Sequence, residues 1–179
     1  MKMEYLRICQ DKKMSNPFVV EGLDNQIYVA NPSKEQFERL PKSMVTYFDY
    51  APDFDVPDYI AAPTPMVSPK LRKVFRMYDD TMQFKSIQNY TNKETDAFKL
   101  APSYYVYYVE QTSCLHESSV IAPNGTVTEL VLVGSQLRNK DIVVIGGIVQ
   151  KITIVSLAVA ESIMRRRLFG IDFEEVRIK

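Results

Sequence analysis

The C-terminal stretch from Ile152 to Lys179 carries the clearest pattern of apolar and polar positions in the chain. A short apolar strand leads to Ser156, whose hydroxyl can accept a hydrogen bond from a free amide of a first helical turn. The apolar residues that follow recur at helical spacing and form one stripe, at Val159, Ala160, Ile163, Met164 and Leu168. The pattern predicts a helix over about residues 157–169.

Charge and glycine predict where that helix ends. Arg165, Arg166 and Arg167 fall in its last turns, where cations face the negative end of the helix dipole. We interpret these arginines as a solvated face rather than a phosphate site. Gly170 follows at a position where the backbone can turn left-handed and stop the helix. A closing strand with an irregularity near Glu174 and Glu175 is then expected from apolar residues at Ile171, Phe173, Val176 and Ile178.

A similar pattern occurs earlier, from Met66 to Ile87. Val67 and Ser68 correspond to Val155 and Ser156, and Pro69 takes a favoured first helical position. The spacing predicts a helix over about residues 69–78, with an apolar stripe at Leu71, Val74, Phe75 and Tyr78. Two such cap–helix–strand units indicate either a duplicated half-domain or two helices built by the same local rules.

The other patterned segments favour strands. Residues 103–109 are rich in tyrosine and valine, which suit a pleated surface. Residues 118–122 and 126–133 flank an Asn-Gly turn, a strong hairpin signal. Residues 142–149 are apolar enough for a buried strand. Consecutive strands around two main helices predict an α+β fold with an antiparallel-rich sheet.

Three weaker patterns lie in the N-terminal third. Residues 4–9 alternate weakly and are predicted as an edge strand. Residues 18–30 have the composition of a hairpin around a Gly-Leu-Asp-Asn turn. Residues 33–40 are bracketed by prolines and are expected to form a short helical turn.

The segment from Tyr47 to Pro65 divides the chain into two parts. It holds five aromatic residues, four aspartates and four prolines, and proline at that density disfavours a helix or a central strand. We expect an ordered, extended loop. An N-terminal lobe, residues 1–64, and an α+β core, residues 65–179, would then form one compact globular unit.

The bulk composition is that of an ordinary soluble protein, 46% hydrophobic and 25% charged. Because 22 acidic residues balance 22 basic ones, no global charge draws the chain to nucleic acid or to an anionic membrane. The charged N-terminus lacks the apolar run of a signal peptide, and no segment approaches the ~20 apolar residues of a membrane span. With Cys9 and Cys114 interpreted as free thiols, we expect a cytoplasmic protein.

Any Ser–His or Cys–His catalysis would depend on His116, the only histidine. Cys114 lies two residues before it, with Ser113, Ser118 and Ser119 nearby, but no strand–elbow–helix serine motif occurs. A polar loop residue is the simpler interpretation. The sequence therefore predicts no catalytic residue and no enzyme.

Metal and cofactor sites are not predicted either. One histidine and two cysteines are too few for a zinc site, and the aspartates of residues 47–65 lack calcium-loop spacing. The Gly146-Gly147 pair fits neither a phosphate-binding loop nor a dinucleotide fingerprint.

The acidic, aromatic segment from Tyr47 to Tyr59 is the candidate interaction surface. Its aspartates can meet basic groups of a partner, and its rings can add contact area. The alternative is a loop whose rings pack inward and whose aspartates are merely solvated. The candidate partner-binding residues are Asp49, Asp53, Phe54, Asp55, Asp58 and Tyr59.

Three features together resemble immunity protein family eleven, formerly a domain of unknown function, which is encoded beside bacterial polymorphic toxins. They are the capped helix and strand from Val67 to Ile87, the tyrosine-rich strand from Tyr104 to Val109, and the C-terminal VSLAVAESIMRRRLFGIDFEEV. The resemblance covers about residues 65–176. It implies a small cytoplasmic protein that binds a cognate protein toxin and blocks it by occlusion, without catalysis or cofactor.

The sequence is also compatible with two other classes of function. One is a structural or regulatory interaction module with a different partner. The other is a hydrolase-type enzyme that uses His116 and Cys114. The identity of the toxin and the oligomeric state are not encoded in any pattern of the sequence.

Overall fold

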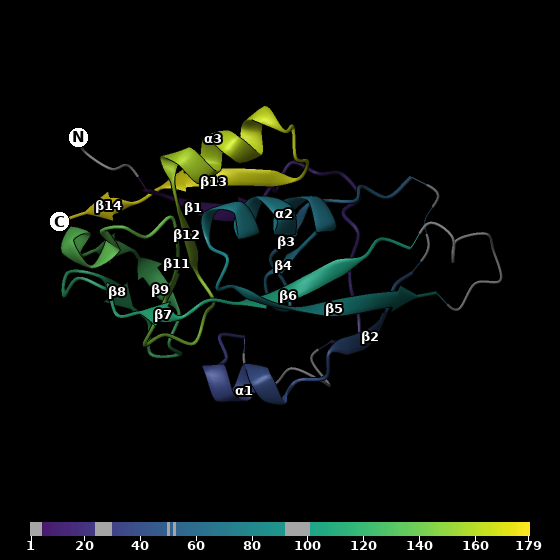
Figure 1. Cartoon of the computed structure of the whole chain (residues 1–179), viewed down its shortest axis with the longest axis horizontal. Helices are drawn as coiled ribbons and strands as arrows, with labels where there is room; N and C mark the ends of the chain where they lie inside the picture. The colour runs from purple at the N-terminus through teal and green to yellow at the C-terminus, as the bar shows by residue number, and fades with distance from the viewer. Residues whose placement is uncertain (1–4, 24–29, 50, 52, 92–100) are drawn as a thin grey trace.

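Two five-stranded sheets and three α-helices form the framework of the protein in a computed structural model (Figure 1). The structure describes residues 5–23, 30–49, 51, 53–91 and 101–179. The first sheet holds β1 (Tyr5–Gln10), β7 (Gln111–Thr112), β11 (Ile142–Ile145), β12 (Thr153–Ser156) and β13 (Ile171–Glu175). The second holds β2 (Ser43–Tyr47), β3 (Tyr59–Ile60), β4 (Met66–Val67), β5 (Gln83–Tyr90) and β6 (Tyr104–Tyr108). This confirms the predicted α+β class.

The helices and the short strands complete the architecture. The α-helices are α1 (Lys34–Arg39), α2 (Pro69–Tyr78) and α3 (Leu157–Arg165), and a 3₁₀ turn, η2, covers Gly134–Leu137. Two small ladders pair β8 (Val120–Ile121) with β9 (Val127–Glu129), and β10 (Val131–Leu132) with β14 (Arg177–Ile178). The hairpin predicted around the Asn-Gly turn is therefore present as β8 and β9.

The two sheets contain the same unit. The strand orders are β13-β1-β12-β11-β7 and β2-β5-β6-β4-β3. In the first sheet, α3 connects β12 to β13, and β1 lies between these strands, antiparallel to both. In the second, α2 connects β4 to β5, and β6 lies between them in the same way. The two cap–helix–strand segments of the sequence therefore belong to two units of identical strand order.

The start of each helix is built alike as well. The hydroxyl of Ser68 accepts a hydrogen bond from the Leu71 amide, and the Ser156 hydroxyl accepts one from the Val159 amide. Each serine also donates its hydroxyl and its backbone N–H to an aspartate just before the neighbouring strand, Asp58 for Ser68 and Asp141 for Ser156. Both helices are thus anchored to their own sheet at the N-cap.

A shared core joins the two sheets through the helices. The apolar stripe of α2 (Leu71, Val74, Phe75) and that of α3 (Val159, Ala160, Ile163) are almost completely buried in one cluster. The cluster also contains side chains from β1, β6, β11 and β12. Since burying a large apolar side chain contributes roughly 1.5–3 kcal/mol, packing of the two helices holds the sheets together.

The predicted edge strand is an interior strand. β1 pairs with β12 on one side and with β13 on the other, so both of its edges carry ladder hydrogen bonds. The prediction was wrong because weak alternation reports one solvated face, whereas edge position depends on partners distant in sequence. β1 therefore belongs to the sheet of residues 142–175, and β2 and β3 to the sheet of residues 66–108.

Other N-terminal predictions have mixed outcomes. The helical turn of residues 33–40 is present as α1, which Ser33 opens with a capping box. The second strand of the hairpin expected for residues 18–30 lies mostly outside the described residues, and Glu21 instead pairs with Tyr47. Residues 47–65 include the two-residue strand β3, placed at the sheet edge, where proline-rich sequence is tolerated.

The end of α3 also differs from the prediction. The helix ends at Arg165, and the left-handed residue that terminates it is Arg167, with φ of 51°. Gly170, with φ of 71°, serves a later turn into β13, where an added Cβ would lie 2.3 Å from the Cβ of Pro57. The glycine is therefore required by close packing against another segment rather than by the helix end.

Replacing Arg167 with glycine should stabilise the protein by about 0.5–1 kcal/mol, because a side chain in the left-handed region is strained and glycine is not. Chemical denaturation measures the change. Arg167→Ala is the matched control, since it removes the same guanidinium but keeps the Cβ, and it should give no gain. Equal stabilisation by both variants would contradict the backbone explanation.

Candidate functional site

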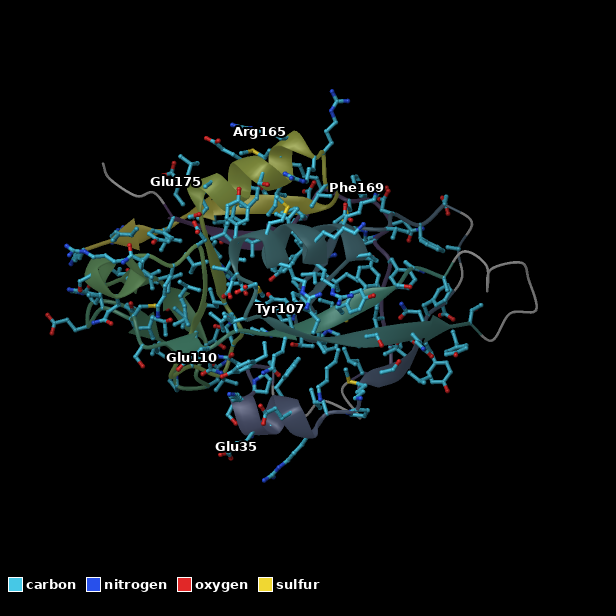
Figure 2. The ribbon with its side chains drawn as sticks, in the orientation of Figure 1. Glu35, Tyr107, Glu110, Arg165, Phe169 and Glu175 are labelled. Carbon is cyan, nitrogen blue, oxygen red and sulfur yellow. The ribbon has the colours of Figure 1, made fainter. Side chains whose placement is uncertain are left out.

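Asp58 is the residue of the acidic segment with the most internal contacts. Its side chain is 7% exposed, and its Oδ1 accepts the Ser68 hydroxyl at 2.5 Å while its Oδ2 accepts the Phe169 amide at 2.8 Å. Its backbone N–H donates to the Phe169 carbonyl at 2.7 Å. Figure 2 places Phe169 beyond the C-terminal end of α3. One carboxylate therefore connects the start of α2 to the end of α3.

Tyr59 is a core residue in this structure. Its side chain is 3% exposed and lies in the cluster shared by the two sheets. Burial raises the pKa of its hydroxyl well above the ordinary value, and the hydroxyl is hydrogen-bonded to Tyr107, whose own hydroxyl lies 2.7 Å from that of Thr153. In Figure 2, Tyr107 lies between α2 and the second sheet. Asp58 and Tyr59 thus have structural contacts and little surface to offer a partner.

The remaining predicted residues lie nearer to solvent. Asp49 and Asp53 are exposed, and Asp55 is half-buried. The Asp55 backbone pairs with the N-terminal segment, where its N–H donates to the Asn16 carbonyl and its carbonyl accepts from the Phe18 amide. These contacts hold Asp55 against residues 16–18.

An aromatic cluster forms the support beneath these aspartates. Phe54 is half-buried, and its ring centroid lies 5.4 Å from that of Phe18 and 6.1 Å from that of Phe48. Both partner rings are almost fully buried in the core under the second sheet. Phe54 therefore packs inward on one side, as the simpler interpretation of the loop predicts, while part of its surface remains accessible.

A hollow of about 320 Å³, which we call the acidic hollow, opens between the two segments. The described residues that line it are Asn16, Pro17, Phe18, Val19, Glu21, Asp49, Ala51 and Phe54. Two of them are carboxylates and none is basic. Val19 is 60% exposed at this hollow and offers apolar contact area there.

The sequence analysis missed the contribution of residues 16–21 to this site. Glu21 reaches the acidic segment because it pairs with Tyr47, through mutual backbone hydrogen bonds of 2.8 and 2.9 Å. Nothing in the local composition of residues 16–21 signals that pairing. The Phe-Val-Val run resembles any short strand, and its partner lies 26 or more residues away.

The residues considered for catalysis lie apart from the acidic hollow. Cys114 is completely buried, and burial raises the pKa of its thiol, so the thiol stays protonated at neutral pH. The Nδ1 of His116 accepts the Ser118 amide at 3.1 Å and lies 2.8 Å from the Ser118 hydroxyl. This local turn gives the imidazole a structural contact, and a protonated, buried thiol is a poor nucleophile.

No group of three or more histidine, cysteine, aspartate or glutamate side chains is placed to hold a metal ion within residues 5–23, 30–49, 51, 53–91 and 101–179. In the same residues, no helix is both long and apolar enough to cross a membrane.

Comparison with protein-family models gives no match to this chain, and comparison with curated proteins gives none either. The resemblance to immunity protein family eleven therefore rests on the sequence features described above.

Replacing Asp58 with alanine should lower the free energy of unfolding by about 2–4 kcal/mol, because the Phe169 amide and the Ser68 hydroxyl both lose their acceptor. Thermal and chemical denaturation measure the loss. Asp53→Ala is the control, because Asp53 lies five residues before Asp58 and is exposed. It should change the free energy of unfolding by less than about 0.5 kcal/mol. Similar losses in the two variants would contradict the assigned roles.

Cys114 should resist iodoacetamide in the native protein at pH 7.5 and react only on unfolding, because its thiol is buried and protonated. Mass spectrometry of peptides from native and urea-unfolded samples locates the modified cysteine. If native Cys114 is alkylated as fast as an exposed free thiol, the result would contradict its burial and support the enzyme hypothesis that uses His116 and Cys114.

Proposed function

We propose that this chain is an immunity protein that binds a cognate bacterial toxin in the cytoplasm and neutralises it by occlusion, without catalysis. The observation that carries the proposal is the acidic hollow, which combines exposed carboxylates, an exposed apolar side chain and a fixed aromatic support. The resemblance to immunity protein family eleven agrees with it.

The chemistry of the hollow favours a basic protein partner. Glu21 and Asp49 lie among its lining residues, and Asp53 and Asp55 follow on the same segment. A lysine or arginine side chain of the toxin would enter the hollow, with its alkyl stem against Val19 and its charge among the carboxylates. Toxins that act on nucleic acid commonly carry such basic surfaces, and covering that surface would block access to the substrate.

The support beneath the hollow lowers the cost of binding. The ring contacts of Phe54 and the backbone pairing of Asp55 with Asn16 and Phe18 fix these two residues before a partner binds. Side chains that are held before association lose less conformational entropy when the complex forms. Occlusion needs only such a complementary surface, so no active-site constellation is required.

The test begins with co-purification of this protein and the product of the adjacent upstream gene. A stoichiometric complex in which that product loses its toxicity is expected, with affinity that falls as salt is added. If the two proteins neither associate nor alter toxicity, the chain is not an immunity protein for that product, and the interaction-module alternative replaces the proposal.

The acidic hollow is tested separately by the triple variant Glu21→Lys, Asp49→Lys and Asp53→Lys. Affinity for the toxin should fall about 100-fold or more, because like charges then meet across the interface. Glu117→Lys, an exposed glutamate on the His116 turn, is the matched charge reversal and should change affinity less than threefold. Full binding by the triple variant, measured by biolayer interferometry, would move the toxin to another surface.

A further inference from the structure

The second sheet carries an exposed face beside α2. β2 and β5 pair in parallel, with Val45 opposite Gln88 and Tyr47 opposite Tyr90. The exposed fractions of Val45, Tyr47 and Tyr90 are 40%, 49% and 39%. Their strand neighbours Met44 and Ile87 face the other side, where they are buried with Phe37 of α1. In Figure 1, α1 and α2 lie on opposite sides of the β5–β6 ribbon.

Two arginines of α2 extend over this face. The Cζ of Arg72 lies 4.2 Å from the ring centroid of Tyr105 and 5.3 Å from that of Phe84, and the Cζ of Arg76 lies 5.9 Å from the Phe84 ring. Phe84 and Gln88 lie four residues apart on β5 and therefore face the same side of the sheet, the side that α2 covers. The guanidinium groups are therefore held against aromatic faces at the border of the exposed surface.

Arg72 holds a buried side-chain nitrogen with no hydrogen-bond partner among the described residues. Its Nε is buried and has no hydrogen-bond acceptor, and no described carboxylate lies within ion-pair distance of Arg72 or Arg76. A buried N–H without an acceptor costs stability, and native proteins rarely keep one without a reason.

The repeated unit shows that the fold itself does not require these arginines. When Ser68 is matched to Ser156, Arg72 corresponds to Ala160 and Arg76 to Met164. The strand registers then match Tyr105 to Leu6 and Phe84 to Phe173. The same position is thus filled by apolar side chains in one unit and by arginines on aromatic rings in the other.

The charge of α2 indicates the chemistry of the occupant. Between Pro69 and Tyr78 the helix has four basic residues and no acidic one: Lys70, Arg72, Lys73 and Arg76. Its exposed neighbours on the sheet are tyrosines, a valine, and the uncharged polar Ser43 and Gln88. Arginine and tyrosine beside apolar area are the residues enriched in the centres of protein interfaces.

We infer that this face, formed by α2 and the exposed side of β2 and β5, is a docking surface for an acidic segment of a partner polypeptide. Aspartate or glutamate carboxylates of that segment accept hydrogen bonds from Arg72 and Arg76, and its apolar side chains cover Val45, Tyr47 and Tyr90. A nucleic-acid partner is less consistent with a chain of zero net charge, in which the basic residues do not extend over a long track. The inference does not rest on the proposed toxin site, although Tyr47 borders both surfaces through its pairing with Glu21.

The test uses a fluorescein-labelled 12-residue peptide of alternating glutamate and leucine, titrated with the full-length protein and followed by fluorescence anisotropy. A lysine–leucine peptide and a 12-nucleotide oligouridylate serve as comparison probes. We expect the acidic peptide to bind at least tenfold more tightly than either. Amide chemical-shift changes should concentrate at residues 43–47, 86–90 and 105.

Substitutions then assign the contact. The double variant Arg72→Ala, Arg76→Ala should weaken the acidic peptide about tenfold or more, and Ala160 at the equivalent position indicates that alanine fits there. Arg72→Lys keeps the charge but not the planar fork, so an intermediate loss is expected. Arg165→Ala, Arg167→Ala removes two exposed arginines of the other unit and should change affinity less than twofold.

Several results would overturn the inference. They are the absence of saturable binding by the acidic peptide, tighter binding of the oligouridylate, chemical-shift changes outside α2 and the named strands, and equal affinity of the wild type and the folded Arg72 variants. Thermal denaturation of each variant establishes that it is folded before its affinity is compared.

Discussion

The carboxylate of Asp58 is the contact on which the arrangement of this protein most depends. It accepts hydrogen bonds from the N-cap of α2 and from the segment after α3, and these two helices belong to different units of the fold. Because a buried carboxylate needs hydrogen-bond donors at both of its oxygens, the contact fixes the two helices relative to each other and to β3. The acidic segment is thereby anchored at one end in the core.

That anchor separates the structural part of the acidic segment from its recognition part. Asp58 and Tyr59 lie in the interior, whereas Asp49 and Asp53, nine and five residues before Asp58, lie at the surface. Phe54 and Asp55 connect the two parts through ring contacts and backbone pairing with residues 16–18. A surface held in this way can present carboxylates to a basic partner without first having to fold.

The repeated unit explains why two surfaces of opposite charge can coexist on a chain of zero net charge. Both units use the same strand order and the same aspartate–serine cap, so the apolar stripes of α2 and α3 satisfy the fold. Two matched helix positions nevertheless differ in charge between the units. They are Ala160 and Met164 in one unit, and Arg72 and Arg76 in the other.

The sequence by itself determined the features that depend on neighbouring residues. Ser68 and Ser156 open helices because capping involves amides only three residues away. The apolar stripes at helical spacing identify the buried faces, except that Met164, predicted in the stripe, is 53% exposed. The α+β class, the tyrosine-rich strand and the Asn-Gly hairpin follow from the same short-range rules.

Only the tertiary structure decided which of four similar aspartates is buried, because Asp58 differs from Asp53 through its contact with Phe169, 111 residues later. The same reason applies to β1, whose interior position requires β12 and β13, and to Glu21, which joins the acidic hollow by pairing with Tyr47. Gly170 does not end α3 as the sequence predicted: Arg167 takes the left-handed position, and the glycine is required where Pro57 packs against it. Contacts between distant segments depend on how the apolar faces pack together, and no local pattern of residues encodes that packing.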